Sequence, residues 1–384
     1  MKLYLKDATI VNPAQNLNGS GSLYIEDGII KSLTPHKDIP QDAAIIDCKG
    51  KYVLPGLMDM HVHLREPGRE DEETIATGSM AAAHGGFTAI ACMPNTEPAV
   101  DSAEVVEYIK KKAEHLPVDV YPIAAATTER KGELIAPIGE LVEAGAVAFS
   151  DDGVAIKTAK ILRRVMEYAG MYDKPVIEHC EDETLAGGAM NESEVSTELG
   201  LPGIHGIAEE LTVVRDIMMS ELTGARVHIA HISTAKAVQL VREGKAKGIK
   251  VTAEVSPHHF TLTEDMVKTY DTNMKMNPPL RKAEDVEAMI VGLQDGTLDC
   301  IATDHAPHAP EEKEMEFEYA PNGILGLETA VGLVFTRLFH TGILGIDAIA
   351  EKMSVNPRKI LNLQLPEIAE GKEANLTIID PDLE

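Results

Sequence analysis

Residues 59–68 read DMHVHLREPG, an alternating stretch that ends in a Pro-Gly turn. Successive side chains of a β-strand point to opposite faces. One face of this strand would therefore carry Asp59, His61, His63 and Arg65. The other face would carry Met60, Val62 and Leu64, which suits packing against a layer of helices. The two imidazoles would lie about 7 Å apart along the strand, so both could reach one metal ion.

The composition indicates a large protein whose cysteines are in the reduced, thiol form. The chain has 384 residues, of which 44% are hydrophobic. One core rarely grows past about 250–300 residues, so we expect one large domain and one smaller domain. The four cysteines, Cys48, Cys92, Cys180 and Cys300, form no C-x-x-C pair. This spacing predicts free thiols in a cytoplasmic protein rather than a disulfide framework.

The net charge limits the classes of partner. A formal charge of −27 opposes binding to nucleic acid and to anionic membranes. The first residues, MKLYLKD, carry no signal-peptide pattern, and no apolar run approaches the roughly 18–20 residues of a membrane span. The negative net charge does not exclude a small anionic substrate, because surface charges are screened beyond about 8 Å at physiological ionic strength.

From residue 57 onward the pattern alternates between apolar strands and amphipathic helices. The predicted strands lie at 57–64, 88–93, 118–124, 146–150, 176–178, 226–230, 250–255 and 299–303. The predicted helices lie at 74–84, 103–115, 139–144, 159–169, 208–222, 235–246 and 283–293, with later ones at 327–340 and 346–353. Eight such units predict an α/β fold, a closed (β/α)8 TIM barrel. An open doubly wound sheet would need a glycine-rich phosphate loop after its first strand, where this chain has EPGR.

The chain ends predict a second, smaller unit. Residues 1–54 contain short apolar runs that indicate an antiparallel β unit, with a tight hairpin at Asp27-Gly28. Residues 375–380 read as one more strand, which we expect to return to that unit. The predicted domains are thus a barrel, 55–359, and a small β-sandwich domain from 1–54 plus 360–384. The charged stretch 310–318 is either a solvated surface or a lid over the barrel rim.

Histidines and carboxylates recur where the predicted barrel strands end. These positions are His61, His63, Asp151, Asp152, Glu178, His179, Glu181, His228, His231, Asp304, His305 and His308. Catalytic groups of such barrels lie at the carboxyl ends of the strands, and imidazole with carboxylate is a ligand set that suits zinc. Even four imidazoles and two carboxylates drawn from this set would exceed the needs of one tetrahedral ion. Two ions that share a carboxylate and a hydroxide account for the surplus.

Four motifs resemble the dihydroorotase family of the amidohydrolase superfamily, close to its bacterial class I type. They are HVHLREPG at 61–68, MPNT at 93–96, KMNPPLR at 275–281 and ATDHAPH at 302–308. The resemblance runs over nearly the whole chain. It implies a zinc-dependent cyclic amidohydrolase that interconverts N-carbamoyl-L-aspartate and L-dihydroorotate in de novo pyrimidine biosynthesis.

The resemblance also implies a ligand set for two Zn²⁺ ions. Residues matching His61, His63 and Asp304 hold one ion, and those matching His179 and His231 hold the other. By alignment the bridging carboxylate falls on Asp152, with Asp151 as the alternative, beside a bridging hydroxide. Other members bridge with a carboxylated lysine, but this strand end has no lysine.

Substrate contacts carry over in the same way, to His63, Arg65, Asn95, Asn277, His308, Asn322 and Gly323. Arg65 would hold the α-carboxylate, and Asp304 would pass a proton from the nucleophile to the leaving ring nitrogen. Two departures stand out. Residues 320–323 read APNG where the family often has an aromatic residue, which weakens the ring contact there. The family's C-terminal segment usually runs a few tens of residues beyond the position of Glu384.

Several alternatives stay open. Related cyclic-amide hydrolases, such as allantoinases and hydantoinases, are disfavoured by Arg65 and by an aspartate bridge. A non-catalytic barrel that supports aspartate transcarbamoylase is disfavoured because every ligand is present. A homodimer and an association with that transcarbamoylase are both left open. Structural roles are expected for the remaining histidines, namely His36, His84, His115, His205, His228 and His340, and a supporting role beside the site is open for His258 and His259.

Overall fold

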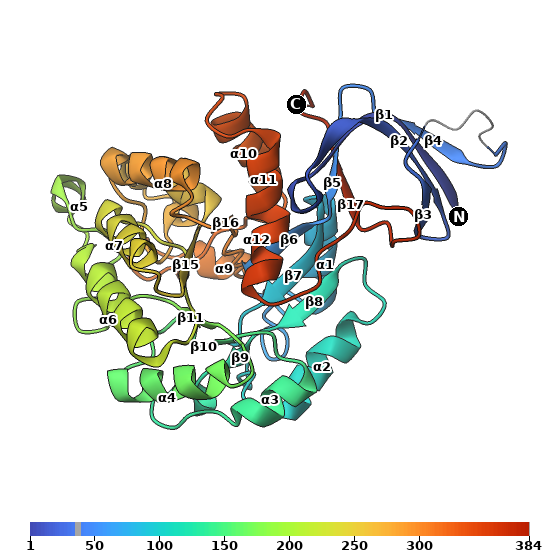
Figure 1. The fold of residues 1–384 in the computed structure, drawn as a ribbon. Coiled ribbons are helices and arrows are strands. Elements are labelled where there is room, and N and C mark those ends of the chain that lie inside the picture. The colour runs from blue at the N-terminus through green and yellow to red at the C-terminus, as the bar shows by residue number, and fades with distance from the viewer. Residues whose placement is uncertain (35–39, 384) are drawn as a thin grey trace.

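A computed structural model describes residues 1–34 and 40–383 (Figure 1). Its centre is a ring of short parallel strands: β6 (Leu57–Val62), β7 (Phe87–Cys92), β8 (Asp119–Pro122) continued by β9 (Ala124–Ala125), β10 (Phe149–Ser150), β11 (Val176–Glu178), β14 (Val227–Ile229), β15 (Val251–Val255) and β16 (Cys300–Ile301). β8 pairs with β7 and β9 pairs with β10, so the third strand joins the two parallel sheets. A parallel bridge between Val62 and His305 closes the ring. The predicted (β/α)8 barrel is confirmed.

Helices surround these strands, and the seven helices predicted between residues 74 and 293 are confirmed to within two residues at each end. They are α1 (Ile75–His84), α2 (Ala103–Ala113), α3 (Ile138–Ala144), α4 (Ala159–Gly170), α6 (Ile207–Thr223), α7 (Ala235–Ala246) and α8 (Ala283–Asp295). Thr74, Thr158 and Thr234 cap three of them by accepting a backbone N–H of the first turn. The short α5 (Glu194–Leu199) escaped prediction because six residues show too little periodicity.

The last helical segments are broken rather than continuous. The predicted helix at 327–340 consists of α10 (Ala330–Val334) and a π-helical turn (Phe335–Phe339). The one at 346–353 consists of α11 (Ile346–Ala350) and a second π-helical turn (Glu351–Val355), followed by α12 (Asn356–Ile360). The charged stretch after β16 begins with the short α9 (Pro310–Lys313). No helix in the described ranges is both long and apolar enough to cross a bilayer.

A separate six-stranded sheet lies beside the barrel (Figure 1). Its strands are β1 (Lys2–Asn12), β2 (Leu17–Glu26), β3 (Ile29–Ser32), β4 (Ala44–Asp47), β5 (Tyr52–Pro55) and β17 (Leu376–Ile379). The predicted hairpin is confirmed, with Asp27 and Gly28 at φ of 50° and 77° between β2 and β3. The expectation of a purely antiparallel unit is wrong. β4 and β5 pair parallel with β1, because the chain returns to the free edge of β1 by a crossover instead of a hairpin.

The C-terminal strand β17 pairs antiparallel with β5, so the two ends of the chain share this sheet. Its core includes Leu5, Leu23, Ile30, Val53 and Ile368. The exact boundaries of the two domains, 1–54 plus 360–384 and 55–359, stay a prediction.

Strand β6 departs from the strict alternation expected for it. Its register against β7 shifts between Asp59 and Val62, and such a bulge interrupts the alternation of side chains. Met60 therefore packs inside the barrel with Ile177 and Cys300 instead of against the helices. Val62 and Leu64 face the helical layer as expected. The bulge lies next to His61 and therefore affects the direction in which this side chain points.

Candidate metal centre

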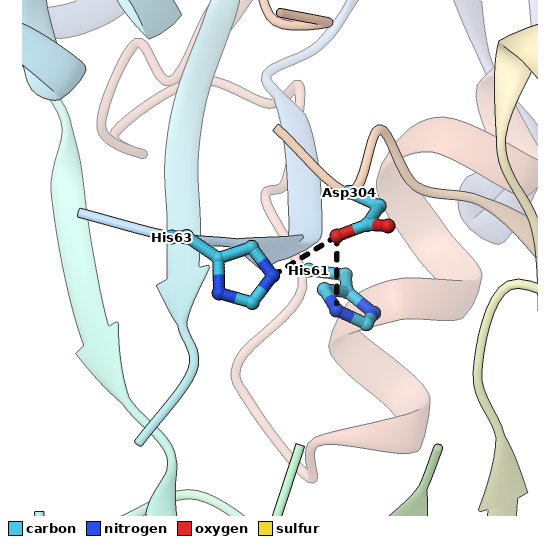
Figure 2. A group of neighbouring side chains, drawn as sticks. All are labelled: His61, His63 and Asp304. Atoms are coloured by element: carbon cyan, nitrogen blue, oxygen red, sulfur yellow. Dashed lines mark hydrogen bonds and ion pairs between the residues drawn. The ribbon is translucent and has the colours of Figure 1, made fainter. Parts of the chain in front are cut away.

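Two histidines of the first barrel strand meet the carboxylate that follows the eighth. His61 Nε2 lies 3.5 Å and His63 Nε2 lies 2.9 Å from Asp304 Oδ1 (Figure 2). His61 is fully buried, and Asp304 is slightly accessible. The three side chains converge because β6 and β16 end side by side, where His63 N donates to His305 O.

A second pair of imidazoles lies beside the first. His179, after β11, and His231, after β14, face each other with 3.0 Å between Nδ1 and Nε2. Asp152 lies between the two groups. Its Oδ1 is 3.4 Å from His61 Nε2 and 3.8 Å from His231 Nε2, and its Oδ2 is 3.5 Å from His63 Nε2. The six predicted ligands are thus neighbours in space.

The structure separates the two aspartates that the sequence left as alternatives. Asp151 accepts hydrogen bonds from the backbone N–H and the hydroxyl of Thr127, at 2.9 and 2.5 Å. Its carboxylate is therefore satisfied away from the imidazoles. Asp152 alone of the pair reaches the rings of His61, His63 and His231.

The donor set fits metal ions. His61 Nε2 and Asp152 Oδ1 are buried and have no hydrogen-bond partner in the protein, which is uncommon for buried polar atoms. Two overlapping triads, His61–His63–Asp304 and His61–Asp152–His231, each bring three ligand atoms within 4.8 Å of one another. Burial alone would raise the pKa of Asp152, yet the surrounding imidazoles hold that pKa well below its usual range. An ionised carboxylate surrounded by imidazoles is a ligand set that binds divalent cations.

Three residues of the site have a left-handed backbone without being glycine. The φ angles are 59° at Arg65, 29° at His231 and 51° at Asp304. Such conformations cost about 1–3 kcal/mol each and persist where the surroundings enforce them. All three residues line the same cavity.

One cavity joins five of the six predicted metal ligands to every predicted substrate contact. Its lining includes His63, Arg65, Asn95, Asn277, His308, Asn322 and Gly323, together with Asp152, His179, His231 and Asp304. Gly323 is required for this shape. Its φ is 151°, and a Cβ there would fall 2.5 Å from the carbonyl oxygen of Ala306.

The polar groups of this cavity have defined partners. The Arg65 guanidinium donates to Pro307 O at 3.1 Å and pairs with Glu72 at 3.1 Å. Burial and nearby Arg65 lower the pKa of His308 to about 4, so its ring is neutral near pH 7. Its Nε2 lies 2.8 Å from Asn322 O, and its Nδ1 lies 2.9 Å from Glu72 Oε1. A neutral ring beside a guanidinium suits an anionic ligand.

Two amides lie closer to the imidazoles than expected of purely substrate-binding groups. Asn95 Oδ1 is 2.8 Å from His63 Nδ1. Asn277 Nδ2 donates to Glu181 Oε2 at 3.1 Å and lies 3.5 Å from His179 Nε2. Each amide can therefore orient an imidazole as well as face the cavity.

The charged stretch 310–318 is fastened to neighbouring loops. Lys313 Nζ donates to Thr272 O at 3.1 Å and to Pro321 O at 2.8 Å. Glu312 pairs with Arg69 at 2.8 Å. These contacts tie α9 to the loops that carry Asn277 and Asn322.

Sequence reasoning missed two residues behind the ligands. Glu254, on β15, lies 2.6 Å from His61 Nδ1, and Arg130 donates to the backbone carbonyls of Asp151 and Asp152. Glu254 could have been noticed as an acidic residue inside a predicted buried strand, since such residues are rarely buried unless paired. Arg130 carries no such pattern, because it lies in a short 3₁₀ turn (Thr128–Arg130).

The remaining histidines divide into two groups. His228 was expected to have only a structural role, yet its Nε2 lies 3.1 Å from Glu254 Oε2. His259 Nε2 donates to Pro278 O at 3.0 Å, and burial lowers the pKa of its neighbour His258 to about 4. Outside the cavity lining lie His84, His115, His205 and His340. His36 falls outside the described residues.

Comparisons with known proteins agree on one family. Residues 50–237 match the family described as dihydro-orotase-like. The chain is 53% identical to a dihydroorotase of Pelotomaculum thermopropionicum, over all of this chain and 90% of that protein. It is 51% identical to a dihydroorotase of Syntrophus aciditrophicus, over 99% of this chain and 90% of the relative.

Solved structures agree on the fold. An L-hydantoinase (dihydropyrimidinase) from Arthrobacter aurescens superposes with a TM-score of 0.83 at 24% identity, covering 97% of this chain and 84% of that one. A D-hydantoinase (dihydropyrimidinase) from Thermus sp. superposes with a TM-score of 0.79 at 26% identity, covering 99% and 87%. The barrel with its additional sheet is thus shared with cyclic-amide hydrolases.

Proposed function

This chain belongs to the dihydroorotase family of cyclic amidohydrolases, and we propose that it interconverts N-carbamoyl-L-aspartate and L-dihydroorotate at a centre of two zinc ions. The observation that carries the proposal is one cavity that holds both the Arg65 guanidinium and the cluster of imidazoles and carboxylates. A guanidinium binds a carboxylate bidentately. Dihydroorotate carries such a carboxylate, whereas hydantoin and allantoin do not. This difference, with the 53% identity to a dihydroorotase, favours the proposal over the related hydrolases.

In this proposal His61, His63 and Asp304 would hold one zinc ion, His179 and His231 would hold the other, and Asp152 would be a ligand common to both. When bound, the two zinc ions would supply a water of lowered pKa, toward about 7, and would polarise the ring carbonyl. Arg65 holds the α-carboxylate of the substrate, with Asn95 and His308 as further donors, and Asn277 contacts the pyrimidine ring.

Asp304 moves the proton. Its carboxylate takes the proton of the attacking water and then gives it to the ring nitrogen as the carbon–nitrogen bond breaks. The products are the terminal carbamoyl NH₂ of N-carbamoylaspartate and a carboxylic acid, which releases its proton to the solvent and becomes a carboxylate. In the reverse direction Asp304 takes a proton from the carbamoyl NH₂ as that nitrogen attacks the protonated carboxyl group, and gives it to the departing hydroxide, which leaves as water as the ring closes.

Metal removal tests the proposal directly. The zinc-loaded protein is expected to contain two zinc ions per chain by elemental analysis and to close N-carbamoyl-L-aspartate to dihydroorotate. Dialysis against a chelator should abolish turnover, and added zinc should restore it. Allantoin and hydantoin serve as the comparison substrates. Faster turnover of either one, or activity without metal, would contradict the proposal.

Exchanging Arg65 for lysine tests the carboxylate contact. Because a compact ammonium cannot reproduce the planar fork, the KM for dihydroorotate is expected to rise about 10- to 100-fold, matching the roughly 1.5–3 kcal/mol of a hydrogen bond to a charged group. The kcat should change far less. Arg163→Lys, on the exposed surface of α4 where Arg163 pairs with Glu167, is the matched control. An unchanged KM in Arg65→Lys would remove Arg65 from the binding site.

We further propose a cytoplasmic location. All four cysteines are buried and free, as expected in a reducing compartment. A homodimer and an association with aspartate transcarbamoylase stay predictions. Light scattering of the purified chain, alone and mixed with the transcarbamoylase, measures both.

A further inference from the structure

Glu254 connects two histidines at the centre of the barrel. Its side chain is completely buried on β15. Oε1 lies 2.6 Å from His61 Nδ1, and Oε2 lies 3.1 Å from His228 Nε2. The chain of contacts continues to Thr252, whose hydroxyl is 2.8 Å from His228 Nδ1. No step of the proposed reaction uses Glu254, His228 or Thr252.

These contacts determine where the ring protons lie. An ionised carboxylate only accepts hydrogen bonds, so His61 must carry its proton on Nδ1 to bond Glu254. This leaves the lone pair of Nε2 as the one that a bound metal ion would use, and His61 Nε2 lies 3.4 and 3.5 Å from the carboxylates of Asp152 and Asp304. His228 likewise donates from Nε2 to Glu254 and accepts from Thr252 at Nδ1.

The two histidines of the first strand are held differently. His63 Nδ1 meets a neutral amide oxygen, that of Asn95, at 2.8 Å. His61 Nδ1 meets a carboxylate at a shorter distance, 2.6 Å. A carboxylate partner makes a metal-bound imidazole a stronger donor and restricts its ring orientation. His61 should therefore be the more tightly fixed of the two.

We infer that Glu254 is a positioning residue, which holds His61 with its Nε2 lone pair toward the metal centre and thereby raises the zinc affinity of the protein. The inference rests on the proposed function. Partners of this kind typically contribute 10- to 100-fold in metal affinity. His228 and Thr252 in turn keep the second oxygen of Glu254 satisfied, so that the carboxylate does not rotate away from His61.

The test measures zinc affinity of the folded protein by competition with a chromophoric chelator. Glu254→Gln keeps the shape, but its amide NH₂ would face an N–H of one of the two rings, so we expect zinc to bind 10- to 100-fold more weakly. Glu254→Asp keeps the charge but is one methylene too short to reach both rings, so we expect a smaller loss. Glu264→Gln is the matched control, because Glu264 is also buried but bonds Asn191. It should leave the zinc affinity within about twofold.

The outcomes separate this inference from the proposed function. A wild-type protein that binds no zinc would contradict the proposed function. Wild-type zinc binding together with an unchanged affinity in folded Glu254→Gln would overturn the inference alone, even if the melting temperature fell. If Glu254→Gln does not fold, nitrogen-15 spectra of zinc-loaded wild-type protein decide, with His61 assigned from a His61→Asn variant. Coordination through Nε2 with a hydrogen-bonded Nδ1 proton supports the inference, and coordination through Nδ1 refutes it.

Discussion

Asp304→Asn should lower kcat about 10²- to 10⁴-fold in both directions, the range of a lost general acid–base. Asparagine has nearly the shape of aspartate but cannot accept and return a proton. Burial would raise the pKa of Asp304, yet His61 and His63 hold that pKa far below its usual range. The apoprotein is therefore expected to carry an ionised carboxylate there, which can bind a cation.

Two measurements make this result specific. Because Asp304 is also a proposed zinc ligand, zinc content must be determined on the same sample as the rate. A melting temperature close to that of the wild type would show that the fold is intact. Asp182→Asn is the control, since Asp182 bonds Thr184 on the loop after β11. A near-normal rate in Asp304→Asn would rule out its proton role.

Asp152→Asn and Asp151→Asn should give opposite results. Loss of the Asp152 charge removes the carboxylate shared by the two groups of imidazoles, so we expect the zinc content to fall below two per chain and kcat to fall at least 10²-fold. Asp151→Asn should keep both zinc ions. It replaces the charged acceptor of two hydrogen bonds from Thr127, so it should lower the stability by about 1–3 kcal/mol.

Elemental analysis, initial rates and thermal unfolding of the two variants make the comparison. The two residues are adjacent and similarly buried, so each serves as the control for the other. If Asp151→Asn lost zinc while Asp152→Asn kept it, the bridge would have been assigned to the wrong aspartate.

Some features of this protein are local and could be predicted well. The helices α1 to α4 and α6 to α8 follow from their 3.6-residue periodicity and threonine caps, which act within one turn. The hairpin at Asp27-Gly28 follows from the conformations that these two residues favour. The barrel itself follows from the repeated alternation of strand and helix.

Other features needed contacts between distant segments. Met60 packs into the barrel because of a bulge set by pairing between β6 and β7, and no local pattern marks it. The parallel pairing of β4 and β5 with β1 depends on the path of a crossover. The role of Glu254 became visible only when β15 was placed across the barrel from His61.

The sequence by itself determined the fold class and the family, because strand–helix alternation and short motifs are local features. The family resemblance proposed five candidate ligands and left the sixth open between Asp151 and Asp152. Only the tertiary structure distinguished Asp152 from Asp151 and paired Glu254 with His61. Both distinctions depend on differences of a few ångströms between side chains far apart in the sequence, and those distances arise only when the barrel closes.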